Sequence, residues 1–470
     1  MTPIDRRSFL RTLAAGAGAL AAAPGARAAE RKPVDRPNIV FIVVDDMGWA
    51  DLSCYGGKAI QTPHIDRMAA EGIRFTDAYA GCTVCAPSRS VLMTGYHMGH
   101  TSVRGNTGGI PLRAEDVTAG EVLKKAGYAV GGFGKWGLGD LDTPGVPERH
   151  GFDRFYGYYH QIHAHNYYPG YLIDTGKKVP LTGKPGTAER HTHYRIFEQM
   201  TRFIREHKDE PFFCYAPWTP PHASYQIPAA DPAWQAVKDK PWPKQAKGHA
   251  AFNLLIDRCV GQVLALLKEL GIDDRTIVFF CSDNGASNRF EGSLNSSGPL
   301  RGFKRAMYEG GIRTPLIARW PGKIKAGAVS ALPCTFADML PTWAELAGAT
   351  AQVPRDIDGL SILPTLLGQA DRQKRHEYLY WEWHRYNWRK QAWEPNGLMQ
   401  AVRAGRWKLC RHRSDQPWEL YDLETDVGEK TDLAAQKPDI LKRMVAYAEA
   451  ARVEPRPQIE PPKPKGKRFR

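Results

Sequence analysis

The chain has 470 residues, of which 42% are hydrophobic and 24% are charged, and its formal net charge is +14. This balance predicts a soluble globular protein with a large core and excludes collagen-like, coiled-coil and low-complexity chains. The positive charge fits an acidic substrate, a membrane surface or nucleic acid, but no zinc-finger spacing, RNP signature or Lys/Arg-dense helix supports nucleic acid. Beyond residue 30, no apolar run approaches the roughly 18 residues of a membrane span.

The N-terminus has the features of a removable export signal. Arg6 and Arg7 precede a weakly apolar Ala/Gly run, and Ala26-Arg27-Ala28 is a small-x-small cleavage pattern. We predict a signal peptide over residues 1–28, and the paired arginines favour the twin-arginine route. The mature protein is then periplasmic or secreted, with the export machinery as a partner.

Strand and helix signals alternate over the following part of the chain. Asn38 to Val44 is a continuous apolar run, which is typical of a strand buried on both faces of a parallel sheet. Further strands are expected over residues 128–133 and 276–280, and helices closed by a glycine are expected over residues 63–71, 118–126 and 250–270. The pattern predicts an α/β fold over residues 36–370, with a doubly wound, mostly parallel sheet flanked by helices.

The pattern changes from about residue 377. Short aromatic strand-like segments precede a helical one; they cover residues 377–383, 397–402, 407–410, 419–423 and 438–452. We predict a smaller C-terminal α+β subdomain over residues 371–455 with a short antiparallel sheet, and then a basic, proline-rich tail over residues 456–470. The eight cysteines are too sparse for a disulfide scaffold, and those in apolar runs are expected to be buried thiols.

Two predicted strands end in acidic or amide residues. Asp45 and Asp46 follow the first strand, and Asp283 and Asn284 follow the strand over residues 276–280. Ligands of open α/β sheets bind beyond the carboxyl ends of strands, and carboxylate and amide oxygens suit a hard divalent cation. If the two strands are neighbours, the four side chains form one metal site. The first pair alone is also compatible with a turn or a helix cap.

A third candidate element begins at Cys82. It contains Cys85-x-Pro87-x-Arg89, followed by Ser90-x-Leu92-Met93-Thr94-Gly95. Pro87 suits the first turn of a helix, which leaves Cys85 at the positive N-terminal end, where a reactive or anionic group is favoured. A redox or zinc pair formed by Cys82 and Cys85 is the alternative interpretation of the two cysteines.

This segment closely resembles the signature of type I sulfatases, the formylglycine-dependent, arylsulfatase-like members of the alkaline-phosphatase superfamily. The resemblance extends along most of residues 37–435 and implies hydrolysis of an aryl or carbohydrate sulfate monoester. Its other blocks are Pro37 to Gly48, Thr62 to Asp66, Gly134 to Gly139, Pro220 to His222, Ser282 to Gly285, Gly302 to Lys304, Glu309 to Pro315 and Glu419 to Leu423.

The resemblance also implies a cofactor and a modification. Cys85 would be converted to formylglycine by a separate maturation enzyme, and its hydrated aldehyde would supply the nucleophilic oxygen. One divalent cation, calcium, would be held by five positions: Asp45, Asp46, Asp283, Asn284 and the modified Cys85.

The resemblance assigns roles to the remaining polar residues of its blocks. Arg89 would stabilise the formylglycine hydrate, and Lys135 and Lys304 would contact the sulfate. His222 would protonate the leaving alcohol, with Lys304 as the alternative donor. Outside these blocks, the two lysines and the histidine would be interpreted as ordinary loop or surface residues.

One position departs from the family pattern. Gly137 stands where the family usually has a histidine that helps to position the formylglycine hydroxyl, so either another group replaces it or nucleophile activation differs. The nearby segment over residues 158–168 carries Gln161, His163 and His165, which we predict to line the pocket and bind substrate. A packed aromatic loop and a histidine metal site are the alternatives for this segment.

Two other functions stay open at this point. A formylglycine-dependent phosphonate or phosphate ester hydrolase would share the fold and Cys85, and a non-catalytic binder of sulfated glycans would follow if Cys85 were never converted. The basic charge favours a sulfated polysaccharide or glycosaminoglycan fragment. We expect loops near residues 100–112, 155–195, 225–250 and 380–400 to set specificity, with the aromatic stretch 380–393 closing the pocket.

Overall fold

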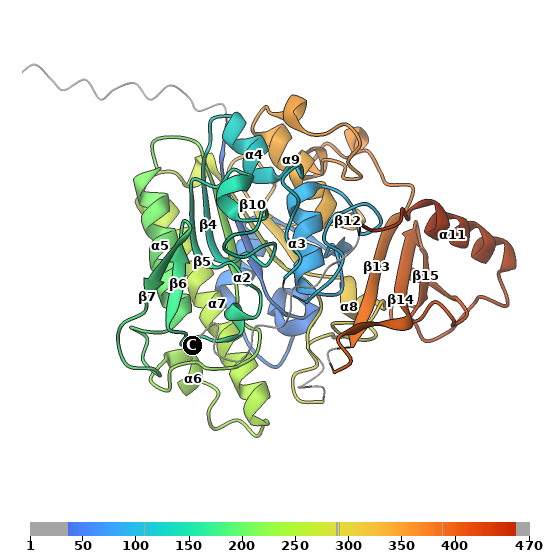
Figure 1. Ribbon diagram of the computed structural model, residues 1–470, viewed down its shortest axis with the longest axis horizontal. Coiled ribbons are helices and arrows are strands. Elements are labelled where there is room, and N and C mark those ends of the chain that lie inside the picture. Colours follow the sequence, from blue (N-terminus) through green and yellow to red (C-terminus); the bar gives the residue numbers. More distant parts are fainter. Residues whose placement is uncertain (1–35, 108, 288–289, 291, 388, 457–470) are drawn as a thin grey trace, which may run out of the picture. The chain divides into compact units, whose positions relative to one another are not determined.

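The computed structural model describes residues 36–456 except 108, 288–289, 291 and 388 (Figure 1). These residues belong to one compact unit that begins at Arg36. The predicted signal peptide over residues 1–28, and the predicted tail apart from its first residue, lie outside the described residues.

A ten-stranded sheet forms the centre of the described residues. Its strands lie in the order β11 (Ala328–Ser330), β2 (Ile73–Phe75), β10 (Leu316–Arg319), β9 (Thr276–Ser282), β1 (Asn38–Val44), β8 (Phe212–Trp218), β4 (Ala129–Lys135), β5 (Arg154–Tyr158), β6 (Tyr171–Asp174) and β7 (Lys177–Pro180). The five central strands from β9 to β5 are parallel, and antiparallel pairing begins at β10 on one side and at β6 on the other. A separate parallel pair joins β3 (Ala78–Tyr79) to β12 (Cys334–Thr335).

Helices cover both faces of this sheet. Alternate side chains of β1 enter two different hydrophobic cores, because successive residues of a strand point to opposite faces. One core includes residues of α3 (Cys85–Thr94), α4 (Ala119–Lys125) and α9 (Met339–Leu346). The other includes residues of α2 (Pro63–Ala70), α5 (Thr192–Glu206) and α7 (Lys244–Glu269). The predicted fold class, a mostly parallel sheet between two helical layers, is confirmed.

The longest helix is a core element of this layer. In length and apolar composition α7 would suffice to cross a membrane, but 72% of its most apolar window is buried inside the protein. It begins six residues before the position predicted from the sequence and ends beside Gly271, whose φ is +66°. Among the described residues, no other helix passes the same test.

The other two glycines predicted to close helices act in different ways. Gly127 follows α4 with a φ of +79°, as expected of a C-terminal glycine. Gly72 after α2 does not adopt a left-handed conformation; a Cβ there would lie 2.1 Å from the carbonyl oxygen of Ala318 in β10. Close packing against the sheet, rather than a cap, therefore requires a glycine at position 72.

A four-stranded antiparallel sheet follows the central one in the chain. It contains β13 (Leu379–Asn387), β14 (Ala392–Ala404), β15 (Trp407–Arg411) and β16 (Glu419–Asp422), with α11 (Pro438–Ala450) packed on one face. Its other face packs on Tyr79, Met307 and Ile312 of the larger part of the protein. Strand β13 runs four residues beyond its predicted end, with a bulge between His384 and Tyr386, and this extension reaches the site described below.

Three further α-helices of the described residues are short, and the cysteines are free thiols. The remaining α-helices are α6 (Pro232–Gln235), α8 (Glu309–Ile312) and α10 (Leu363–Leu366). All eight cysteines lie in the described residues as free thiols; Cys54 is half-buried and the others are buried, as expected from their apolar surroundings.

Candidate active site

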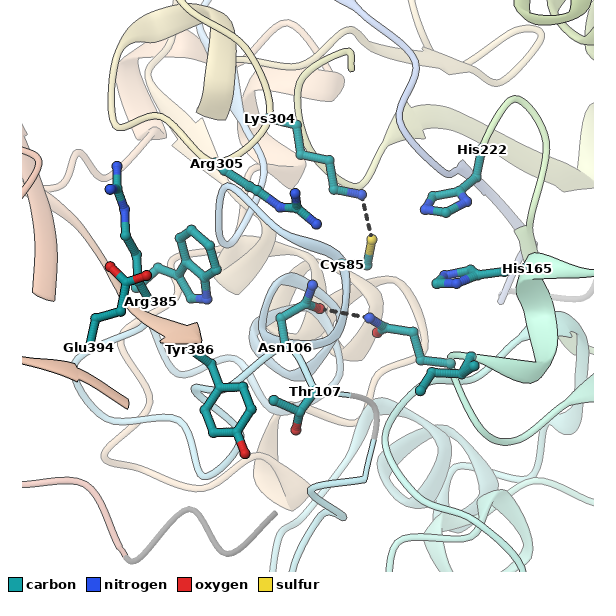
Figure 2. Close-up of a pocket in the computed structure, with 13 residues that line it drawn as sticks. Cys85, Asn106, Thr107, His165, His222, Lys304, Arg305, Arg385, Tyr386 and Glu394 are labelled. Atoms are coloured by element: carbon teal, nitrogen blue, oxygen red, sulfur yellow. Dashed lines mark hydrogen bonds between the residues drawn. The ribbon is translucent and has the colours of Figure 1, made fainter. Parts of the chain in front are cut away.

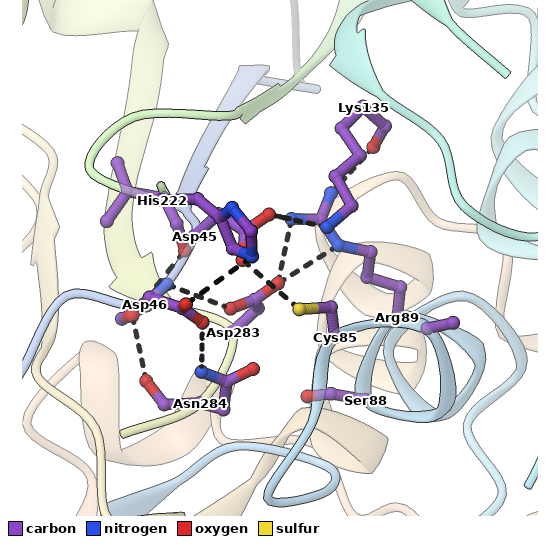
Figure 3. Close-up of polar contacts among 12 residues, drawn as sticks. Asp45, Asp46, Cys85, Ser88, Arg89, Lys135, His222, Asp283 and Asn284 are labelled. Carbon is purple, nitrogen blue, oxygen red and sulfur yellow. Dashed lines mark hydrogen bonds and ion pairs between the residues drawn. The ribbon is translucent and has the colours of Figure 1, made fainter. Parts of the chain in front are cut away.

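The two acidic strand ends meet at one edge of the sheet. Strands β1 and β9 are neighbours, with Val44 paired to Ser282, so Asp45 and Asp46 lie beside Asp283 and Asn284 (Figure 3). The Asn284 side-chain amide donates to Asp46 Oδ1 at 2.7 Å. The condition stated for the metal site, that the two strands be neighbours, is therefore met.

Cys85 is the first residue of α3 and points at this edge. Its Sγ lies 3.2 Å from Asp45 Oδ1, and Lys304 Nζ donates to the same sulfur at 3.1 Å. Burial, together with the Asp45 carboxylate, raises the pKa of Cys85 to about 12. Without a bound cation, the unmodified thiol is therefore protonated and a weak nucleophile, and the helix N-terminus does not reverse this.

Two buried cations, Arg89 and Lys135, and the cavity-edge Lys304 pair with the three carboxylates. Arg89 donates to Asp283 Oδ2 from NH2 at 2.8 Å and from Nε at 3.1 Å. Lys135 Nζ lies 2.6 Å from Asp45 Oδ2, and Lys304 Nζ contacts Asp46 Oδ1. The six side chains come from the segment after β1, from α3, from β4 and from the segments after β9, which only the tertiary structure brings together.

The pKa values of Asp45 and Asp283 shift in opposite directions. Burial would raise the pKa of Asp45, but Lys135 and the other nearby cations hold it well below its usual range. For Asp283, burial and repulsion from Asp45 outweigh Arg89 and raise the pKa to about 6. A bound cation would remove the repulsion between the two carboxylates, which is one reason that this arrangement suits a metal ion.

Two stacked histidines border the network. The rings of His165 and His222 lie 4.3 Å apart at an interplanar angle of 12°. His222 Nδ1 contacts the carbonyl oxygen of Ala223, and its Nε2 lies 3.6 Å from Asp46 Oδ2. Burial lowers the pKa of His222 despite Asp45 and Asp46, and burial together with His222 lowers that of His165 well below the usual value.

A cavity of about 430 Å³ opens over Cys85 (Figure 2). Of the predicted substrate-binding residues, Gln161 and His165 line it. His163 does not; its ring packs edge-on against Tyr158 at 5.1 Å and also contacts Tyr171. The lining residues are Cys85, Asn106, Thr107, Gln161, Ile162, His165, His222, Lys304, Arg305, Trp383, Arg385, Tyr386 and Glu394.

Several lining residues were not singled out from the sequence. Asn106 and Thr107 fall in a loop expected to set specificity, and Trp383, Arg385 and Tyr386 fall in the aromatic stretch expected to close the pocket; all five line the cavity. Arg305 carried no signal beyond its place next to Lys304. Among the described residues, no histidine of residues 158–168 belongs to a group of three or more possible metal ligands.

The space at Gly137 is faced by Gln161. Gly137 has a φ of +78°, and a Cβ there would lie 3.7 Å from Gln161 Oε1 and 3.8 Å from Arg89 Cδ. Gln161 Nε2 donates to Asn106 Oδ1 at 3.0 Å, and the same oxygen accepts the Ala86 N–H at the start of α3. Gln161 Oε1 is buried without a hydrogen-bond partner in the part of the chain that the structure describes.

The residues present fit one divalent cation. Asp45, Asp46, Cys85 and His222 each offer a ligand atom, and these atoms lie within 4.8 Å of one another. The Oδ1 atom of Asn284 is buried and accepts no hydrogen bond from the described residues. Carboxylate and amide oxygens are the ligands that a hard cation prefers, although Asp283, the third predicted carboxylate ligand, is not part of this group of four.

Comparison with known proteins agrees with this geometry. Residues 37–349 match the family described as Sulfatase, and residues 302–449 match N-sulphoglucosamine sulphohydrolase, C-terminal. Arylsulfatase A of Homo sapiens is 32% identical over 460 residues, covering 87% of this chain and 86% of that protein. N-acetylgalactosamine-6-sulfatase of Homo sapiens is 34% identical over 358 residues, covering 70% of this chain and 66% of that protein.

Solved structures show the same fold. Ps i-CgsB in complex with k-i-k-neocarrahexaose has a TM-score of 0.77 and 28% identity, covering 88% of this chain and 92% of that chain. The phosphonate monoester hydrolase of Agrobacterium radiobacter has a TM-score of 0.65 and 21% identity, covering 88% of this chain and 94% of that chain, which shows a shared fold alone. The chain belongs to the sulfatase family and is a sulfuric ester hydrolase.

Proposed function

We propose that this enzyme removes sulfate from a sulfated carbohydrate, with formylglycine formed from Cys85 as its nucleophile. The observation that carries the proposal is the place of Cys85, at the start of α3 and within hydrogen-bond distance of both Asp45 and Lys304. The thiol of Cys85 is protonated and is therefore a weak nucleophile. A hydrated aldehyde at this position supplies two hydroxyl groups, one to attack sulfur and one to release the product.

Asp45, Asp46, Asp283 and Asn284 hold one divalent cation in this proposal, and calcium is the ion that an all-oxygen donor set favours. Such an ion supplies positive charge beside the nucleophile and the sulfate oxygens. Each of the three carboxylates contacts one of the cations Lys135, Arg89 and Lys304, so the protein itself holds the carboxylates near one another.

The two lysines stabilise charge that develops on the sulfate. Lys135 is buried, and Lys304 lies at the edge of the cavity beside Cys85. Attack on sulfur increases negative charge on its oxygens, and preorganised cations in a buried site stabilise that charge most. Arg89, fixed by Asp283 and by the carbonyl oxygen of Lys135, keeps its guanidinium beside the start of α3.

His222 is the proposed proton donor to the leaving alcohol. Its Nδ1 is engaged by a backbone carbonyl, so the proton would leave from Nε2, which requires the doubly protonated ring. Burial lowers the pKa of His222, whereas Asp46 and Cys85 raise that of the alternative donor Lys304 although burial opposes them. With His222 as the acid, kcat/KM falls as the pH rises through a range below the ordinary histidine pKa, and His222→Gln removes this dependence.

Mass spectrometry and one pair of variants test the nucleophile. The tryptic peptide over residues 75–89 contains both Cys82 and Cys85. From a host with a maturation enzyme, we expect an aldehyde at Cys85 and an unmodified thiol at Cys82. Cys85→Ala should be inactive on 4-nitrophenyl sulfate, whereas the control Cys82→Ala, which changes a buried thiol outside the cavity, should remain active.

Other results would select the remaining functions. Unmodified Cys85 in an active enzyme would refute the formylglycine proposal. Faster turnover of a phenyl phosphonate monoester than of any sulfate ester would make the enzyme a phosphonate hydrolase. Fully converted protein that binds a sulfated glycan without hydrolysing it would be a binding protein.

Maturation and export belong to the same proposal. We propose a catalytic region over residues 36–370 followed by a C-terminal subdomain over residues 371–455. A maturation enzyme acts on Cys85, and residues 1–28 direct export by the twin-arginine route to the periplasm or beyond. Replacing both Arg6 and Arg7 by lysine should retain the enzyme in the cytoplasm, which cell fractionation followed by an arylsulfatase assay would detect.

A further inference from the structure

The cavity has two walls of different character. On one side lie the stacked rings of His165 and His222. The opposite side, in Figure 2, carries two guanidinium groups: Arg305 from the segment after β9 and Arg385 from β13. The Cys85 end already has its cations matched to carboxylates, so these two arginines are an additional positive charge at the mouth of the site.

Arg305 is held in an unusual backbone conformation. Its φ is +74°, a region that residues other than glycine seldom adopt. Its N–H donates to Thr83 O at 3.1 Å and to Thr83 Oγ1 at 2.8 Å, which fixes this conformation. Glycine would meet the backbone requirement with less strain, so the arginine is explained by its side chain, which points into the cavity and makes no ion pair with the described residues.

Arg385 lies at the bulge of β13. A bulge changes the direction in which side chains leave a strand, and here Arg385 and its neighbour Tyr386 both line the cavity. The half-buried Arg385 side chain donates from Nε to Met399 Sδ at 3.4 Å, a weak acceptor, and no carboxylate of the described residues lies within ion-pair distance. A partly desolvated guanidinium without a strong acceptor favours binding of an anion.

Trp383 and Glu394 complete this wall. Trp383 lines the same cavity and offers an apolar indole face, on which a sugar ring can pack. Glu394 contributes an acceptor suited to a hydroxyl group, and its single negative charge is outnumbered by the two arginines of this wall. The wall therefore suits a hydroxylated ring that carries an anionic substituent.

We propose that Arg305, Arg385 and Trp383 form a subsite for a second anionic group on the substrate, a sulfate or a carboxylate on the same saccharide as the sulfate to be removed. This inference rests on the proposed function, because the first sulfate occupies the Cys85 end of the cavity. The planar guanidinium fork matches both anions, so each can bind through paired hydrogen bonds. The substrate class is then a multiply anionic saccharide rather than a singly charged ester.

Matched substrates and variants test the subsite. The substrates are 4-nitrophenyl sulfate, a monosulfated disaccharide, and the same disaccharide with either a second sulfate or a uronate carboxylate. We expect Arg305→Gln and Arg385→Gln each to lower kcat/KM for a doubly anionic sugar by about 10- to 100-fold, the loss of one charge-assisted hydrogen bond or pair. Activity on 4-nitrophenyl sulfate should stay at the wild-type value.

Arg389→Gln is the matched control. Arg389 is exposed on the same hairpin as Arg385 and does not line the cavity, so this change removes the same charge without touching the subsite. Its kinetics should match those of the wild type on every substrate. Comparing the uronate substrate with the disulfated one distinguishes the two anions. The substrate whose kcat/KM falls more on Arg385→Gln carries the anion that the subsite binds.

Three results would overturn the subsite. The first is an equal loss on the aryl ester and the doubly anionic sugar, the second is no loss on either, and the third is the same loss from Arg389→Gln. Failure of the proposed function is distinguishable from failure of the subsite. If the proposed function fails, wild-type enzyme with Cys85 converted to formylglycine would turn over no sulfate ester. In that case, calorimetric titration of Cys85→Ala with the doubly anionic disaccharide still tests the subsite, because Arg305→Gln in that background should weaken binding and Arg389→Gln should not.

Discussion

Two buried charge clusters in this protein have the same count of charges and different surroundings. The site cluster consists of Asp45, Asp46 and Asp283 with Arg89, Lys135 and Lys304. The junction cluster lies where the C-terminal sheet meets the larger part of the protein and consists of Asp77, Glu309 and Glu429 with Arg313, Arg403 and Lys408. Each pairs three carboxylates with three cations.

The junction cluster is closed by its own hydrogen bonds. Glu309 accepts from Lys408 Nζ at 2.8 Å on one oxygen and from Arg313 Nε at 2.7 Å on the other. Glu429 accepts the Glu309 N–H at 2.7 Å and lies 3.2 Å from Lys408 Nζ. Tyr79 also donates to Glu309, so the carboxylates use their oxygens within the protein.

The site cluster, unlike the junction cluster, contains a hydrogen-bond acceptor without a partner among the described residues. Asn284 Oδ1 has no hydrogen-bond partner among the described residues, and Lys304 and Cys85 border an open cavity. Charge balance alone therefore does not distinguish an active site from a structural ion-pair network. The site cluster differs from the junction cluster in having a potential metal ligand without a hydrogen-bond partner in the described part of the chain and in opening onto a cavity.

The largest expected effect is on catalysis at the site cluster. Lys304→Gln should lower kcat/KM for 4-nitrophenyl sulfate by about 10²- to 10³-fold, as the loss of one preorganised charge contact does elsewhere. Some loss of stability should accompany it, because Lys304 contacts Asp46 and its side chain is only 10% exposed. Steady-state kinetics and thermal unfolding measure the two, and a loss explained entirely by unfolding would contradict the assignment.

The junction cluster should show the opposite pattern. Lys408→Met leaves Glu309 and Glu429 buried together without their shared cation, and removal of one partner from such a group destabilises by about 3–5 kcal/mol. Denaturant titration measures this change, and activity per folded molecule should be unchanged. Lys390→Met, at an exposed lysine, is the control and should leave stability unaltered.

Metal binding should depend on the unused amide oxygen. Asn284→Ala should weaken calcium binding by at least about tenfold. The shift in unfolding temperature with calcium concentration, measured after chelation, reports this without reference to activity. An unchanged calcium titration would exclude Asn284 from the metal site.

The smallest effect is on the pH dependence of stability at the junction. Burial raises the pKa of Glu429 to about 7 although Lys408 opposes it, so the folded state retains a proton that the unfolded state has released. The stability from this group is complete below the ordinary glutamate pKa and is lost as the pH rises to about 7. Wild type should therefore lose stability relative to Glu429→Gln as the pH rises across this range.

Glu309 does not interfere with this measurement. Burial opposes the shift, but Lys408, Arg313 and Arg403 lower the pKa of Glu309 to about 2. Its contribution is present above the ordinary glutamate pKa and is lost only as the pH falls toward about 2. A pH-independent stability difference between wild type and Glu429→Gln would contradict the raised pKa of Glu429.

The sequence by itself determined the local features of this protein. The apolar run of β1 begins and ends at the predicted residues, because a strand buried on both faces has no polar position to blur its limits. Pro87 placed Cys85 at the start of α3, and α4 begins one residue after its predicted start, behind the capping box of Thr118 and Glu121. These signals depend on neighbours a few residues away.

Only the tertiary structure decided which distant side chains meet. Gln161 faces the space at Gly137 while His163, two residues later, turns into the aromatic core, and the sequence presents both as polar residues of one segment. Arg305 and Arg385 share a cavity wall across 80 positions of sequence because a left-handed residue and a bulge aim their side chains inward. Such a meeting depends on how the sheet and its connections pack, which no local pattern encodes.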